Sequence, residues 1–211
     1  MGKLLTSALY GLLPAILLSG CTAFRAGGEV QKGRFELMYG DPNAALTHFQ
    51  RAADLNPNYV FTYLPFRPSV WTYVGRAHYQ ARKLSEASSA LEQALARNRD
   101  DALARFYLGL ALSRSGARER GVKELESGLA GVRSDLDYLQ RYTIDGNFWD
   151  PGDSIRKEIE ASLAMIQGRD ISWERLIANG EKIGHELERE IDEARREARR
   201  ERHADSDNDK P

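Results

Sequence analysis

The most constraining feature of this chain is an internal repeat in its first two thirds. Glycine recurs at Gly33, Gly75 and Gly109, and the second and third of these lie 34 residues apart. The first interval is 42 residues, which is the same period with an eight-residue insertion. Such a period predicts an array of helical units, none of which buries its own apolar face without a neighbour.

Further residues recur at fixed places in the three units, and each place has a physical reason. Small residues stand where two helices approach closely, and large apolar residues fill the space between helices. The small residues are Ala45, Gly75, Ala87, Gly109 and Gly121, and the large ones are Phe49, Leu91 and Leu125. Gly40 and Gly116 stand where a turn must follow the first helix of a pair. Pro57 ends the second helix of the first pair.

One stretch carries these features most clearly. Trp71-Thr72-Tyr73-Val74-Gly75-Arg76, followed by Ala87-x3-Leu91-x2-Ala94, resembles the tetratricopeptide repeat, a pair of antiparallel helices. The resemblance implies an all-α fold: a helical-repeat solenoid of about three repeats, at 26–57, 68–101 and 102–135, within a domain at 29–131. A generic helical bundle with a coincidental spacing is the alternative.

Residues 58–69 form the insertion, with the sequence NYVFTYLPFRPS. Its prolines exclude a continuous helix through the segment. The aromatic residues allow two interpretations. The segment is an apolar projection toward a partner or a bilayer, or it is a connection held against the repeats by Tyr59, Phe61 and Phe66. We favour the second, because exposed apolar patches of that size are unusual.

The region 132–204 is expected to be helical and to cover the end of the array. We expect one helix to start with Asp150 as N-cap and Pro151 at the first position. Gly168 ends it. A last helix begins near Ser172 with a one-sided apolar stripe and becomes a long charged terminal helix, and a disordered tail follows at 205–211. The charged part is either a solvated extension or a docking helix for a partner.

The N-terminus predicts an envelope lipoprotein. The apolar stretch Leu4 to Leu18 is short for a membrane helix, which needs about 20 residues, and suits a signal peptide. Leu18-Ser19-Gly20-Cys21 resembles a bacterial lipobox. The resemblance implies removal of 1–20, acyl chains such as palmitate on Cys21, and a linker at 21–28. Because Thr22 rather than Asp follows, we expect the outer membrane, facing the periplasm. An uncleaved anchor is the alternative.

Composition excludes several classes of protein. The net charge is −1, so no basic field favours nucleic acid. The single cysteine and the scattered histidines predict neither a metal site nor a disulfide, and we expect no cofactor. A calcium loop over 145–153 fits poorly, because Phe148 and Trp149 interrupt the acidic pattern. The motifs of nucleophilic or phosphate chemistry are absent, so we expect no enzymatic activity.

The repeat resemblance also implies a concave groove lined by the first helix of each pair. The residues at its inner positions are Arg34, Thr72, Arg76, Tyr79, Phe106, Ser113 and Arg114. Arginine presents donors suited to carboxylates, so the groove is expected to bind a protein or peptide partner. The alternative is that the chain's own C-terminal helix fills the groove and that its glutamates pair with Arg34 and Arg76.

Together these features predict a non-enzymatic scaffold or adaptor lipoprotein, and Phe148-Trp149-Asp150-Pro151 also resembles repeat lipoproteins of bacteria. Such a protein assists an envelope complex, such as outer-membrane protein assembly, secretin or pilus biogenesis, or cell-wall enzyme machinery. One alternative is a hydrolase of cell-wall or polysaccharide material that uses Asp145, Asp150 or Asp153. The other is a structural spacer that self-associates through its charged helix. The oligomeric state stays open.

Overall fold

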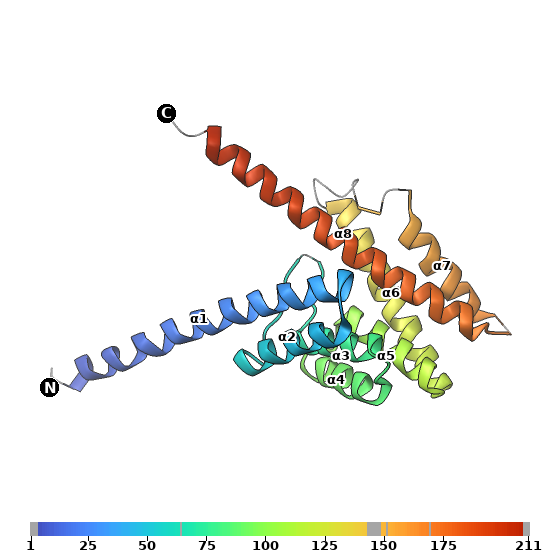
Figure 1. Cartoon of the computed structure of the whole chain (residues 1–211), viewed down its shortest axis with the longest axis horizontal. Coiled ribbons are helices and arrows are strands. Elements are labelled where there is room, and N and C mark those ends of the chain that lie inside the picture. Colours follow the sequence, from blue (N-terminus) through green and yellow to red (C-terminus); the bar gives the residue numbers. More distant parts are fainter. Residues whose placement is uncertain (1–3, 64, 143–148, 151, 169, 209–211) are drawn as a thin grey trace. The chain divides into compact units, whose positions relative to one another are not determined.

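The chain is all-helical, as the sequence predicts. The computed structural model describes residues 4–63, 65–142, 149–150, 152–168 and 170–208, with side chains described between 22 and 200. Its helices are α1 (Leu4–Tyr39), α2 (Pro42–Leu55), α3 (Val70–Gln80), α4 (Leu84–Arg97), α5 (Ala102–Ser115), α6 (Arg118–Tyr142), α7 (Ser154–Gln167) and α8 (Trp173–Asn208) (Figure 1). The β-structure in these ranges is limited to isolated bridges in the insertion.

The helices belong to two compact units. The first comprises residues 1–61 and 67–101 and contains α1 to α4, and the second comprises residues 62–66 and 102–211 and contains α5 to α8. Short turns join α1 to α2, α3 to α4 and α5 to α6, and the helices of each of these pairs pack against each other. Three helical hairpins therefore follow one another along the chain.

The recurring glycines mark the close contact inside each hairpin. A Cβ at Gly33 would collide with the ring of Phe49, one at Gly75 would collide with Leu91, and one at Gly109 would collide with the backbone of Leu125. In every pair the two residues are 16 positions apart. The small residue of the first helix thus receives the large residue of the second, as the sequence pattern predicts.

Local capping explains where the helices of the first unit begin. Asp41 precedes Pro42 and its side chain accepts a 2.9 Å hydrogen bond from the backbone N–H of Asn43. Ser69 caps α3 in the same way by accepting from the N–H of Thr72. In the second unit Gly116 takes a φ of +94° in the turn after α5, where the sequence predicts a turn glycine.

The insertion is a folded connection. Its flanks pair through the N–H of Phe61, which donates to Pro68 O at 3.0 Å, and the N–H of Val70, which donates to Tyr59 O at 2.9 Å. Phe61 is buried in the first unit and meets Tyr73 edge-on at 6.0 Å between ring centroids. Phe66 is buried in the second unit, 5.9 Å from the ring of Trp149. The packed interpretation accounts for these aromatic residues.

In the second unit α8 packs on α5 and α7, and α7 packs on α6. The apolar stripe of α8 supplies the contact, and its members Leu176, Ile183, Leu187 and Ile191 are fully or almost fully buried. Gly180 approaches Leu110 and Gly184 approaches Tyr107, so both glycines lie where α8 meets α5. The absence of a side chain at these two positions lets the two helices approach closely.

The predicted start of α7 is wrong. The helix begins at Ser154, because Asp150, Gly152 and Asp153 all have positive φ values, of 52°, 83° and 60°. The Asp150 carboxylate nevertheless caps the helix from four residues upstream. It accepts hydrogen bonds of 2.7 and 3.0 Å from the backbone N–H groups of Ile155 and Arg156. Gly168 ends α7 as predicted.

The two ends of the chain differ from the predicted boundaries. The helix α1 runs through the predicted cleavage point before Cys21, whose side chain lies outside those described. The tail predicted to start at 205 is helical to Asn208. Opposite charges earlier in α8, such as Asp192 and Arg196, 2.7 Å apart, stabilise the helix that precedes it. Residues 209–211 lie outside the described ranges. Within those ranges, no helix combines the length and the apolar character that a membrane crossing requires.

Candidate functional site

The predicted groove residues of the first unit do not line an open surface. Arg34, Thr72, Arg76 and Tyr79 are all buried, with at most 3 % of each exposed. The guanidinium of Arg34 lies 4.5 Å from the ring centroid of Phe61, so the insertion covers it. Arg76 stacks at 5.4 Å over Tyr73 of its own helix. These side chains act in packing.

Thr72 also has a structural role. Its hydroxyl donates a 2.6 Å hydrogen bond to the buried carboxylate of Asp101, which accepts a second one, of 3.3 Å, from the N–H of Ser69. This network ties the start of α3 to the segment after α4. A buried charge-assisted network of this kind stabilises the hairpin and leaves Thr72 without a group to offer a ligand.

In the second unit α8 contacts two of the three predicted groove residues, Phe106 and Arg114. Phe106 lies against the position of Gly184, and Arg114 forms an ion pair and hydrogen bond with Glu181 of α8. Ser113 faces α6 instead, where Gly121 packs on it. On α5, therefore, the C-terminal helix lies on the face that the resemblance assigns to a ligand.

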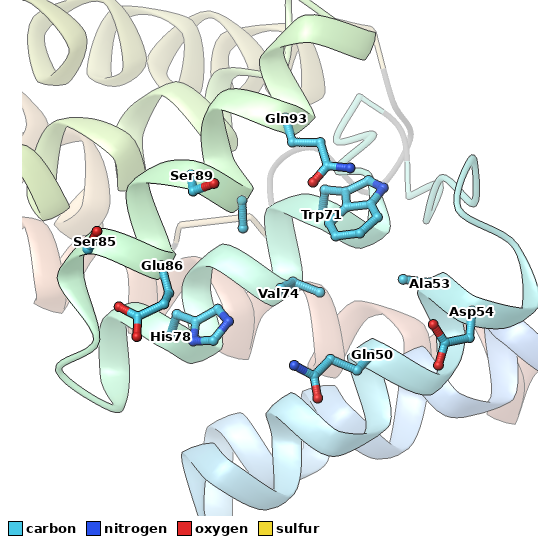
Figure 2. Close-up of a pocket in the computed structure, with 11 residues that line it drawn as sticks. Gln50, Ala53, Asp54, Trp71, Val74, His78, Ser85, Glu86, Ser89 and Gln93 are labelled. Carbon is cyan, nitrogen blue, oxygen red and sulfur yellow. The ribbon is translucent and has the colours of Figure 1, made fainter.

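The open concave surface of the first unit lies elsewhere. A hollow of about 670 Å³ lies between α2 and α4, with α3 as its floor (Figure 2). We call it the α2–α4 groove. Its lining residues are Gln50, Ala53 and Asp54 from α2, Trp71, Val74 and His78 from α3, and Ser85, Glu86, Ser89, Ala90 and Gln93 from α4.

The groove residues predicted on α3 lie on a buried face of this helix, and another face lines the hollow. Residues advance by about 100° along a helix, so Trp71, Val74 and His78 share one face. Thr72, Arg76 and Tyr79 share another, which lies roughly 130° around the helix, somewhat more than a third of a turn. The spacing of Trp71, Val74 and His78 was visible in the sequence, but these positions read as packing residues of the repeat.

The polar side chains of the groove are mostly uncommitted. Within the described part of the chain, the side chains of Gln50, Asp54, Ser85, Glu86 and Ser89 make no hydrogen bond or ion pair to other residues. They point toward the hollow or its rim from both walls (Figure 2). Two carboxylates, an amide and two hydroxyls are therefore available to a ligand in one concave surface.

The floor is held in place by fixed contacts. The indole N–H of Trp71 donates a 2.9 Å hydrogen bond to Pro57 O, and the guanidinium of Arg97 lies 5.3 Å from the centroid of the indole. With its amide oxygen turned toward Arg97, Gln93 accepts hydrogen bonds of 3.2 Å from that guanidinium, which leaves its amide N–H groups to donate elsewhere. Trp71 is thus a positioned apolar surface.

The charge of the groove lining depends on whether His78 is protonated. Burial lowers the pKa of its imidazole, the Glu86 carboxylate opposes this shift, and Lys83 adds to it. Its Nδ1 atom is buried without a hydrogen-bond partner among the described residues. His78 is therefore neutral at neutral pH, so Asp54 and Glu86 give the lining a negative charge. No hydrogen bond links His78 to Ser85 or Ser89 in the described structure, so no nucleophile–base pair is assembled there.

Of the three acids proposed for a hydrolase, the two that the structure describes do not form an accessible site. The side chain of Asp150 is fully buried and, besides the α7 amides, contacts Arg156 Nη1 at 3.2 Å. Asp153 is 58 % exposed and lies 3.6 Å from the same guanidinium, and Asp145 is outside the described residues. The described residues contain no group of three or more His, Cys, Asp or Glu placed to hold a metal ion.

A second hollow, of about 480 Å³, lies between α1 and α2. Phe24, Arg25, Lys32 and Arg51 are among its lining residues, together with Glu29. The hydrogen bond from His48, 2.7 Å long, and then that from Lys32 lower the pKa of Glu29. Lys32 pairs with Glu29 at 2.8 Å, and Asp54 lines this hollow as well as the α2–α4 groove.

Comparison of this chain with family models, with curated proteins and with solved structures finds no match.

Proposed function

We propose that this chain is a non-enzymatic protein-binding adaptor, built on tetratricopeptide-type helical hairpins and anchored in the bacterial envelope through lipid on Cys21. The observation that carries the binding function is the α2–α4 groove, a concave surface with five uncommitted polar side chains over an apolar floor. The small–large pairing at 16-residue spacing supports the repeat assignment. The anchor is supported by the lipobox resemblance alone.

The proposal includes a location and a class of partner. Lipid on Cys21, followed by Thr22, favours the outer membrane with the helical body in the periplasm. There the groove would recruit a component of an envelope assembly, such as outer-membrane protein, secretin or pilus, or cell-wall enzyme machinery. Repeat folds provide binding surfaces, and their partners are set by the lining residues.

Site-specific photo-crosslinking in cells tests the binding function. A crosslinker at Ser89, which lines the groove, should capture one dominant protein that mass spectrometry identifies. The matched position is Glu92, on the same helix but outside the lining, and it should not capture that protein. Equal capture from both positions, or none from Ser89, contradicts binding through the groove.

The anchor is tested separately. Cys21→Ser should release the protein from membranes while its helical circular dichroism spectrum is retained, because a serine hydroxyl is not the thiol that lipidation requires. Persistence of the variant in the membrane after a high-salt wash would show that the apolar N-terminal segment anchors the chain without lipid.

A further inference from the structure

We propose that the α2–α4 groove binds an extended peptide segment that carries an arginine or lysine side chain. This inference rests on the proposed adaptor function and specifies the chemistry of the partner.

The shape fits a short extended segment. Ser85, Ser89 and Gln93 succeed one another at four-residue intervals along one wall, and Gln50 and Asp54 do so along the other. The row on α4 spans eight residues, which is about 12 Å at the helical rise. An extended chain advances about 3.3 Å per residue, so three to four peptide residues match that length.

The charge favours a cation. Asp54 and Glu86 lie toward opposite ends of the groove (Figure 2), and no lysine or arginine is among the lining residues. Arg97 and Lys83 lie nearby, but Arg97 is stacked on Trp71 at the edge. A basic side chain meets a carboxylate that makes no ion pair among the described residues, whereas an acidic peptide or a phosphate group meets two charges of its own sign in the lining.

The remaining groups fit a peptide backbone. Gln50 carries a donor and an acceptor, as does each peptide unit, Gln93 offers its amide N–H donors, and the serine hydroxyls can do either. Trp71 and Val74 give an apolar floor against which the aliphatic stem of an arginine can lie while its guanidinium reaches a carboxylate. A neutral glycan would use the same amides but gain nothing from the two carboxylates.

The test uses the full-length chain in non-ionic detergent and three mixtures of fluorescein-labelled, C-amidated pentapeptides. Their central residue is arginine, glutamate or norleucine, and the flanking residues are randomised. Fluorescence polarisation should show the arginine mixture binding at least about fivefold more tightly than the other two, and less tightly at 0.5 M than at 0.05 M salt. In ¹H–¹⁵N spectra the indole N–H resonance of Trp71, assigned with Trp71→Phe, should shift on binding.

Three substitutions locate the effect. Asp54→Asn and Glu86→Gln should each weaken binding of the arginine mixture by about two- to fivefold, because each removes one exposed charge. Asp100→Asn is the matched control, since it changes an exposed aspartate of the same unit outside the lining, and it should leave affinity unchanged. These side chains are exposed, so folding should be retained in all three variants.

The outcomes separate this inference from the adaptor function. Equal binding of the three mixtures, preference for the glutamate mixture, an unshifted Trp71 resonance, or insensitivity to both groove carboxylates overturns the basic peptide. If Ser89 still captures one partner in cells in that case, the groove remains a protein-binding site of other chemistry. Failure of both experiments would remove the groove from the function altogether.

Discussion

The face of α5 covered by α8 and the α2–α4 groove show two outcomes for the surface of a helical hairpin. On α5 the chain's own helix α8 covers the surface: Gly180 and Gly184 let α8 approach closely, and Glu181 pairs with Arg114. In the groove, five polar side chains (Gln50, Asp54, Ser85, Glu86 and Ser89) have no hydrogen bond or ion pair among the described residues. The difference shows that a surface available for binding is identified by polar side chains without partners inside the chain. The place of a residue in the repeat is not enough to identify such a surface.

The largest expected change in the free energy of unfolding distinguishes a buried residue of α8 from an exposed residue of the groove. Ile183→Ala removes a fully buried side chain of α8 and should lower the free energy of unfolding by about 2–5 kcal/mol. Ser89→Ala, in the groove, should change it by less than about 0.5 kcal/mol, because an exposed hydroxyl without a partner is removed. Urea unfolding followed by circular dichroism measures both. Similar losses in the two variants would mean that the groove is part of the core.

The next largest loss of stability is expected when the hydrogen bonds from Asp150 to the start of α7 are changed. Asp150→Asn should lower the free energy of unfolding by about 1–3 kcal/mol, because one carboxylate oxygen that accepts from α7 and Arg156 becomes a donor facing donors. Asp153→Asn, at a largely exposed position, should cost less than about 0.5 kcal/mol. The pair is compared by urea unfolding, and a loss at Asp153 as large as that at Asp150 argues against the capping role.

Local rules predicted the helical hairpins from sequence. A glycine at Gly33, Gly75 or Gly109 and a large residue 16 positions later are both encoded within one hairpin, so no long-range information is needed. The turn glycine Gly116 and the apolar stripe of α8 were found by the same reasoning. Helix boundaries failed at Asp150, where three residues with positive φ delay the start of α7.

The binding surface could not be predicted in the same way. Which face of α3 stays open depends on where α2, α4 and the insertion pack, and these contacts join residues far apart in the chain. Arg34 and Arg76 looked like ligand-binding cations, but one is covered by Phe61 and the other stacks on Tyr73. The uncommitted state of Ser85 and Ser89 is visible only when the hydrogen bonds are known.

A smaller effect on the stability of the protein is expected from Glu190 on α8. Burial, then Glu193, raises its pKa, with a further small contribution from Asp150, whereas the backbone N–H of Asp150 and the charge of Arg189 lower it. The folded state therefore holds the proton more tightly than the unfolded state. Stability from this group is present below the unfolded pKa near 4.5 and is lost as pH rises through the higher folded pKa. Glu190→Gln should stabilise the protein at pH 7 by up to about 1 kcal/mol, with a smaller gain near pH 4.5.

Urea unfolding of the Glu190 variant and the parent at the two pH values measures this difference. Glu193→Gln is a control on the same helix, because it keeps the buried carboxylate and removes only one neighbouring charge, and its gain should be smaller. A destabilised Glu190→Gln at pH 7 would mean that the charge is needed where α8 meets Asp150.

The smallest effect returns to the groove and to His78. Because burial lowers its pKa, the unfolded state takes up a proton more readily, so stability is complete above about pH 6.5 and falls as pH drops through the lower folded pKa. His78→Gln should abolish that part of the decline in stability between pH 7.5 and 5.5, whereas Ser89→Ala should preserve it.

Protonation of His78 would also place a cation between Glu86 on α4 and Gln50 and Asp54 on α2, close to Lys83. Binding of the arginine mixture should therefore weaken at pH 5.5 in the parent protein more than in His78→Gln. An equal decline in both proteins would assign the pH dependence to the carboxylates and leave His78 as a packing residue of the groove floor.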